Sequence, residues 1–431
     1  MRFLNPSRQA HSAARTASVD IPDMGYRPHS IGSAVTLLFV SALTIMAATA
    51  ISPGLPAIEA AFAGRENAAL LTRLLITMPA LVIACVAPMA GSLTDRFGRW
   101  RVLVGAVLLY GFAGMSGLVL DTLHGLLFGR ALLGAAVAGI MTATTALIGD
   151  LYSGSGRDRF MGLQTAFTGV GGLVFMTAGG LLSEAGWRAP FAIYGLAFVV
   201  FPAVVVYLAE PRRTGQMMTA EPTGAFPWLA IAALFFAAAF NSLIFYLIPT
   251  QLPFHLHALG VTSPSVAGMT LGVFNLAIAV ASLGYGYLRA RIGILGGLGL
   301  GFGLMAAGYG IIAAAASHAF VLTGLVATGA GMGCIMPGLM AGAMTLAPPS
   351  VRGRVAGGLT ASIFLGQFLS PLASQPWVGW FGYGAAFRDM GLLLALASLL
   401  AVLLAVRTRI LPRRTDERSI GTQDLYRSLK K

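Results

Sequence analysis

The feature that most constrains this chain is a succession of apolar runs, each about as long as a bilayer is thick. A helix needs roughly 20 apolar residues to cross the hydrocarbon core, and lipid excludes spanning segments whose backbone is not hydrogen-bonded internally. We count twelve such runs and expect each to form one membrane-spanning helix. Their expected limits are residues 32–56, 69–91, 101–120, 124–149, 159–183, 189–208, 227–250, 264–287, 295–315, 319–346, 355–378 and 383–407.

Composition agrees that lipid is the main solvent. Only 10% of the residues are charged, against about 25% in soluble domains. The net charge of +13 would suggest nucleic acid in a soluble protein, but here the basic residues lie in tails and in short loops between apolar runs. We therefore expect a lipid bilayer around the protein and no nucleic-acid partner.

The widest gap between apolar runs divides them six and six. We expect a tail (1–31), an N-terminal six-helix half (32–208), a linker (209–226), a C-terminal six-helix half (227–407) and a basic tail (408–431). Arg and Lys concentrate in the tails, the linker and alternate loops, and such clusters stay on the cytoplasmic side. This predicts a multi-pass protein of a cell membrane, expected to be a bacterial inner membrane, with both termini in the cytoplasm.

A charged loop motif occurs twice. The sequence GSLTDRFG at residues 91–98 is matched by GYLRARIG at residues 286–293, 195 residues later. An internal repeat at this spacing indicates duplication, and two six-span units have the same orientation in the membrane. The sequence thus predicts an all-α membrane protein whose twelve transmembrane helices form two six-helix parallel repeats around a central cavity.

The pattern G-x-L-x-D-R-x-G-R between the second and third spans, with its degenerate copy, resembles the hallmark loop of the major facilitator superfamily. The resemblance covers roughly residues 32–407. It implies a secondary active transporter that works by alternating access, not an enzyme, and one that needs no cofactor.

The same resemblance implies a cytoplasmic gate. In that family the acidic residue at the Asp95 position caps the next helix and pairs with an arginine, and Asp150 occupies the place of an acidic partner. Ala290 replaces the aspartate in the second copy, which predicts a weaker lock there. The expected gate residues are Gly91, Asp95, Arg96, Gly98, Arg99, Asp150 and Arg291.

Arg130, in the fourth span, is the clearest charge within an apolar run. The segment Gly129-Arg130-x-x-x-Gly134 resembles a second motif of the family, which is linked to proton coupling. A cation at mid-bilayer costs about 2.5–3.5 kcal/mol on insertion scales, so we expect Arg130 to attract a substrate anion or to tune a proton site. The alternative is an arginine packed against helix-end carbonyls and water.

Other polar residues within the spans are candidates for a substrate or coupling cavity. For each of them the alternative is an ordinary hydrogen bond between helices, worth about 0.6 kcal/mol. Arg73 is expected to extend to the interface, and Glu59, Asp121 and Glu184 are expected to be solvated at outer span ends. The cavity candidates besides Arg130 are Asn241, Tyr246, Asn275 and Gln367.

Two departures from the family pattern bear on function. Ala47 replaces the usual acid of the first span, and Phe175-Met176 replaces the Gly-Pro of the fifth-span motif of antiporters. We expect a monomeric exporter of small organic molecules, drugs or metabolites, coupled to protons. The alternative is an uptake or exchange carrier for small organic anions. No metal site is expected, because His255-x-His257 lacks a third ligand.

Overall fold

The computed structural model describes residues 30–210, 227–348 and 351–410. Within these residues the chain is helical and contains no strand, and ten helical segments are long and apolar enough to cross a membrane. The fold is therefore an all-α membrane protein, as the sequence predicts. The linker and both tails expected from the sequence lie almost entirely outside the described residues, as does the side chain of Asp95.

The helices follow the apolar runs closely. Thr122 begins α5 by accepting a hydrogen bond from the Gly125 amide, and Ser263 begins α10 in the same way, as expected of residues that cap helices. The helices are α1 (Ile31–Thr49), α2 (Leu55–Ala61), α3 (Ala68–Phe97), α4 (Arg99–Met115), α5 (Leu123–Leu151), α6 (Gly154–Glu184), α7 (Leu196–Tyr207), α8 (Trp228–Phe245), α9 (Leu247–Ala258), α10 (Pro264–Ala313), α11 (His318–Leu346) and α12 (Arg352–Ile410).

Two of the helices are longer than one membrane crossing. The α10 helix has 50 residues and is kinked at Gly293, where φ is 73° and ψ is −177°. The α12 helix has 59 residues and is kinked at Gly382, where φ is 79° and ψ is 171°. Each of these helices contains two of the predicted apolar runs, and this accounts for ten segments where twelve runs were counted.

Glycines with positive φ recur at nearly constant spacing. Gly98 and Gly293 lie 195 residues apart, with φ of 96° and 73°. Gly64 and Gly260 lie 196 residues apart and both have φ of 86°, and Gly186 and Gly382 have the same separation. Only glycine adopts such backbone angles without large strain, so each pair marks a chain reversal at an equivalent point of the sequence.

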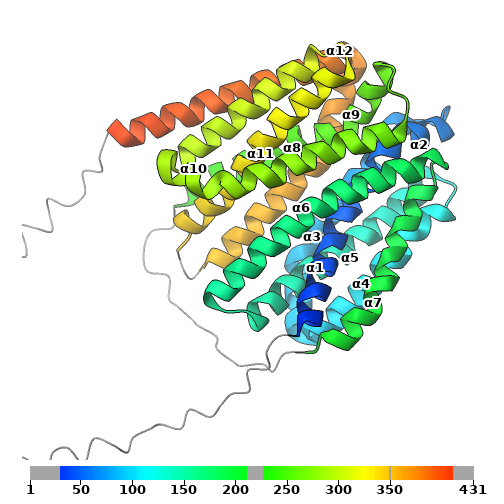
Figure 1. Cartoon of the computed structure of the whole chain (residues 1–431), viewed down its shortest axis with the longest axis vertical. Helices are drawn as coiled ribbons and strands as arrows, with labels where there is room; N and C mark the ends of the chain where they lie inside the picture. Colours follow the sequence, from blue (N-terminus) through cyan, green and yellow to red (C-terminus); the bar gives the residue numbers. More distant parts are fainter. Residues whose placement is uncertain (1–29, 211–226, 349–350, 411–431) are drawn as a thin grey trace, which may run out of the picture.

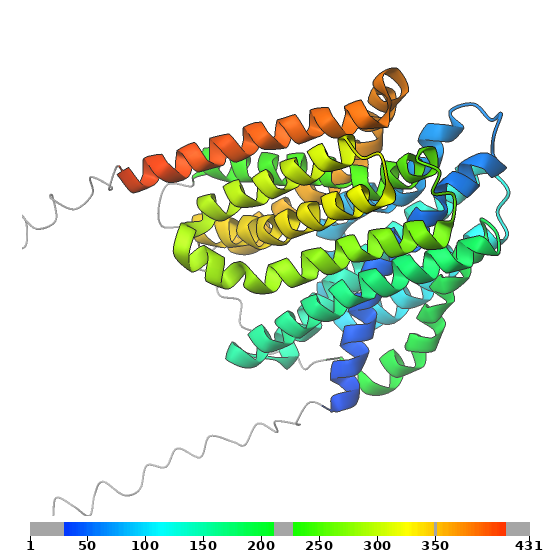
Figure 2. The same cartoon turned by 45° about the horizontal axis from the view of Figure 1, so that its top comes forward.

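The buried apolar side chains form two clusters. One is built mostly from α1–α7, here called the first helix group, and the other mostly from α8–α12, the second helix group. Helices α6 and α10 pack against each other across the two groups, and so do α3 and α12. Figure 1 and Figure 2 show α6 beside α10 along much of their length.

The contact between α6 and α10 depends on small residues. A methyl group added at Gly180 would lie 2.5 Å from the Pro264 carbonyl oxygen, and one at Gly268 would lie 2.5 Å from the Met176 carbonyl oxygen. The two backbones therefore touch at this end of the pair, as small residues allow in membrane helices.

Candidate transport cavity and the two ends of the bundle

Two ends of the molecule are distinguished below. The Gly98 end holds the connection between α3 and α4 and the kink of α10. The Arg73 end holds α2, the start of α3 and the end of α9, and lies at the upper right of Figure 1.

A cavity of about 400 Å³ lies between the two helix groups. Its walls come from α1 and α6 of the first group and from α8, α10 and α11 of the second. Apolar side chains form most of the wall, and no charged residue of the described chain lines it. The polar side chains in the wall are those of Gln164, Thr165, Thr168, Asn275 and Ser282.

Of the predicted cavity residues, Asn275 is in the wall. Its amide nitrogen donates to the Met176 sulfur at 3.1 Å and to the Leu271 carbonyl at 3.1 Å. Asn241 is fully buried and does not line the cavity itself. Its amide nitrogen donates to the sulfur of Met332 at 3.4 Å, and Met332 lines the cavity. The side-chain oxygen of Asn241 has no hydrogen-bond partner among the described residues.

The other predicted cavity residues are not in this wall. Tyr246 is buried at the break between α8 and α9, and its neighbour Phe245 faces the cavity instead. Gln367 is half-buried on α12. The polarity of a residue within a span therefore did not by itself identify the side chains that face the cavity.

Arg130 is placed differently from the cavity cation expected from the sequence. Its side chain is buried within the first helix group and does not line the 400 Å³ cavity. The guanidinium donates to the Tyr194 hydroxyl at 2.8 Å and lies 4.8 Å from the centroid of the Phe191 ring. Aromatic faces and a hydroxyl stabilise a desolvated cation, which explains how α5 holds this charge with no acidic partner in the described part of the chain.

At the Gly98 end, a carboxylate outside the motif caps the helix. Glu210 accepts hydrogen bonds from the backbone amides of Arg99 and Trp100, both at 2.9 Å, at the N-terminus of α4. The position suits a negative charge because the helix dipole is positive there. Gly98 makes room for it, since a methyl group there would lie 2.6 Å from Glu210 Oε2. The family resemblance assigned the capping role to Asp95, and it gave no reason to single out Glu210, which follows α7.

Two of the predicted gate residues form an ion pair at this end. Asp150, at the end of α5, pairs with Arg99, and both side chains are about one-third exposed. Among the other predicted gate residues, Arg96 is exposed with its guanidinium 5.5 Å from the Phe97 ring, and a side chain at Gly91 would meet open space. Arg291 lies over the Tyr287 ring at 4.2 Å.

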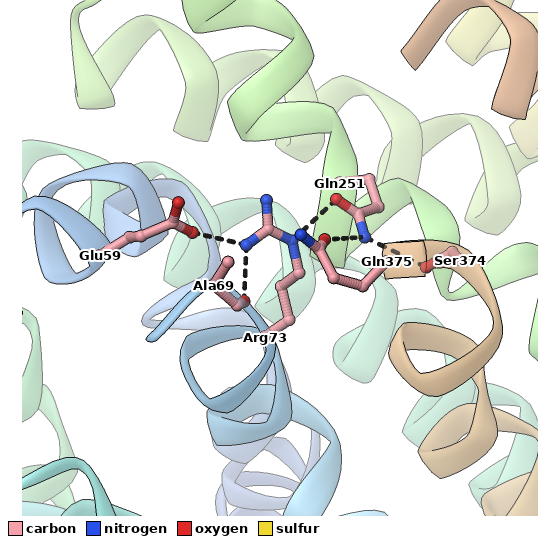
Figure 3. A network of polar contacts seen from close by, with 6 residues as sticks. All are labelled: Glu59, Ala69, Arg73, Gln251, Ser374 and Gln375. Atoms are coloured by element: carbon pink, nitrogen blue, oxygen red, sulfur yellow. Dashed lines mark hydrogen bonds and ion pairs between the residues drawn. The ribbon is translucent and has the colours of Figure 1, made fainter. Parts of the chain in front are cut away.

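At the Arg73 end, Arg73 is buried rather than extended to the interface. Figure 3 shows its guanidinium at the centre of a polar network. The Nη1 atom donates to Glu59 Oε2 at 2.5 Å and to the Ala69 carbonyl at 2.6 Å, and Nε donates to Gln251 Oε1 at 2.8 Å. The Phe254 ring lies 3.7 Å from the guanidinium carbon. Burial is possible because three acceptors and an aromatic ring replace the water around this cation.

Two further contacts join the helix groups at this end. Ser52 donates to the Pro249 carbonyl at 2.6 Å, and Glu184 accepts from the Ser263 hydroxyl at 2.6 Å. Glu59 and Glu184, expected as solvated acids, thus each take part in a specific polar contact. Asp121 is 80% exposed, as expected, and pairs with Arg188 inside the first helix group.

These features define a class of protein: an all-α membrane protein with a cavity between two packed helix groups. The comparison with known families gives the identity. The chain matches the Major Facilitator Superfamily over residues 37–262 and again over residues 230–430, and it belongs to that family. It is accordingly a transporter and not an enzyme.

Individual relatives and structures agree with this assignment. The chain is 29% identical to the tetracycline resistance protein, class C, of Escherichia coli over 69% of this chain and 77% of that protein. It is 26% identical to the 3-(3-hydroxy-phenyl)propionate transporter of Escherichia coli (strain K12) over 46% of this chain and 49% of that protein. A bacterial homolog of the human lysosomal transporter Spinster, solved in an inward-facing and occupied conformation, has the same fold, with a TM-score of 0.71 at 17% identity over 89% of this chain and 98% of that one.

Proposed function

We propose that the protein exports small organic molecules by alternating access, with protons as the driving ion. The observation that carries the proposal is the 400 Å³ cavity whose walls come from both helix groups. A site shared by two groups of helices changes its access when the groups rock against each other. The likeness to a resistance protein over most of both chains favours export.

We infer twelve crossings in two six-helix repeats, residues 32–208 and 227–407. The kinks at Gly293 and Gly382 would each divide a long helix into two crossings, at positions where the first group has Gly98 and Gly186. The family pattern also matches twice, over the overlapping residues 37–262 and 230–430, which supports an internal repeat.

The Gly98 end is assigned to the cytoplasm. The connections there carry Arg96, Arg99, Arg101, Arg289 and Arg291, as the distribution of basic residues across membranes requires. The Arg73 end then faces outward, where contacts between the groups hold it together. The cavity would accept substrate from the cytoplasm or the inner leaflet in this conformation.

The cavity lining indicates the substrate class. Since none of the described charged residues lies in the wall, the site gives an ion little compensation for losing its water. Amide and hydroxyl groups on an otherwise apolar wall suit a neutral, amphipathic molecule with hydrogen-bonding groups. Arg130, which would have favoured an anion, lies outside this wall.

The test is transport by purified protein in proteoliposomes, with and without a pH gradient. A neutral amphipathic probe should accumulate against its own concentration gradient only when a pH gradient is applied. Asn275→Leu should reduce the flux of this probe about tenfold, because one hydrogen-bonding group of the wall is lost. Thr323→Leu, an exposed polar change on α11, is the matched control and should transport normally. Equal flux in the two variants would contradict this cavity as the site.

A second function is favoured by two observations. Ala47 stands where the family usually carries an acid, and one relative is a transporter of an aromatic carboxylate, over about half of each chain. These favour an uptake or exchange carrier for small organic anions. Deleting the gene separates the alternatives: loss of an exporter sensitises cells to a compound, whereas loss of an uptake carrier stops growth on one.

A further inference from the structure

We propose that Arg73 is a latch that holds the two helix groups together at the outward end, and that Glu59 positions it. The inference rests on the proposed alternating-access function. It assigns a role in transport to two residues that neither the sequence motifs nor the family pattern single out.

The contacts of Arg73 come from both helix groups. Glu59 on α2 and the Ala69 carbonyl on α3 hold Nη1 within the first group, while Nε reaches Gln251 on α9 of the second. The ring of Phe254, also on α9, covers the guanidinium at 3.7 Å. A planar guanidinium can make these contacts together because its donors point in fixed, divergent directions.

The receiving side is held in place for this contact. The amide nitrogen of Gln251 donates to the Ser374 hydroxyl and to Gln375 Oε1, both at 3.1 Å, and this turns its oxygen toward Arg73. Gln251 and Ser374 are buried. The latch therefore joins α3 to α9 directly and to α12 through Gln251.

The two partners of Arg73 have different roles when the groups separate. Glu59 belongs to the same group and stays with the arginine, so the cation keeps a counter-charge in both states. The bonds to Gln251 and Phe254 exist only while this end is closed. A surface cavity of about 680 Å³ beside Glu59, lined also by Phe254, His257 and Tyr383, lets water reach the arginine as the contact opens. The pair thus has two arrangements, closed and open, without leaving a buried charge unpaired.

The test measures the separation of the two groups at this end. Spin labels are placed at Ala61→Cys on α2 and Ala316→Cys before α11, both exposed positions, with Cys85 and Cys334 replaced by Ser. Pulsed electron-spin distances in nanodiscs give the populations of the closed and open forms. Arg73→Gln should raise the ratio of open to closed about tenfold, the effect of one charge-assisted hydrogen bond.

Three variants sharpen the outcome. Arg73→Lys should open this end too, because one ammonium cannot reach Glu59 and Gln251 in the geometry of the guanidinium. Gln251→Glu should shift the ratio toward the closed form by giving the latch a counter-charge across the groups, and should slow transport. Arg188→Gln, which breaks the Asp121 pair at the same end but within one group, is the matched control and should leave the distances unchanged.

If Arg73→Gln leaves the spin-label distances unchanged, the latch is overturned. It is also overturned if Arg188→Gln raises the ratio of open to closed forms as much as Arg73→Gln does. Should Arg73→Gln fail to fold, Gln251→Ala removes the receiving group and carries the same prediction. The distance measurements need no substrate. If the protein transports no probe in proteoliposomes but the variants shift the distances as expected, the proposed function is rejected and the latch is retained.

Discussion

The two copies of the loop motif differ in what surrounds the same backbone turn. Gly98 and Gly293 both have positive φ at the junction of two helices. Around Gly98, the Glu210 carboxylate caps α4 and Arg99 pairs with Asp150. At Gly293 a methyl group would meet open space, and Arg291 packs over the Tyr287 ring beside it.

This difference separates two requirements of the motif. The chain reversal needs a glycine in both copies, because other residues are strained at these angles. The charged contacts are a separate feature: at the first copy they tie α4 to α5 through Arg99 and Asp150, and to Glu210, which follows α7. Ala290 stands where the first copy has an aspartate, yet the positive φ at Gly293 is kept, so the turn itself does not depend on that acid.

The largest effect should come from Gly98→Ala. Backbone strain costs about 1–3 kcal/mol at either glycine, but at Gly98 the added methyl also displaces the Glu210 carboxylate from the helix terminus. Thermal unfolding in detergent should show Gly98→Ala clearly less stable than Gly293→Ala. Equal losses of thermal stability in the two variants would mean that the contacts around Gly98 add nothing to the cost of the substitution.

A smaller effect is expected from Glu210→Gln. The amide keeps one acceptor but loses the charge at the start of α4, so stability should fall by about 1 kcal/mol, the usual worth of a helix cap. Denaturation of this variant is compared with Glu66→Gln, an exposed acid at the other end. A loss no greater than that of Glu66→Gln would show that the cap is not stabilising.

The smallest effect is expected from Asp150→Asn. Both partners of the Arg99 pair are about one-third exposed, and ion pairs of this kind contribute about 0.2–1 kcal/mol. The loss should shrink at high salt. Measuring unfolding at low and high ionic strength checks this, and a loss insensitive to salt would contradict a solvent-screened pair.

Apolar run length predicted the membrane helices well because each run must satisfy its backbone within lipid. Side-chain roles were harder to predict. Asn275 lies in the wall of this cavity. Gln367, chosen likewise for polarity within a span, and Arg130, chosen also for its motif, do not. Arg73 was expected at the interface because it lies near the outer end of its apolar run. Its side-chain acceptors come from α2 and α9, 14 residues before it and 178 residues after it.

The sequence alone determined that the chain lies in lipid, that its loop motif recurs 195 residues later, and that it resembles the transporters of one superfamily. These follow from the hydropathy and the residue pattern of short segments, which are local properties. Tertiary structure alone decided which acid caps α4, which polar groups reach the cavity and which arginine joins the two helix groups. Those depend on the rotation of each helix about its axis and on partners distant in the chain, and no local pattern encodes either.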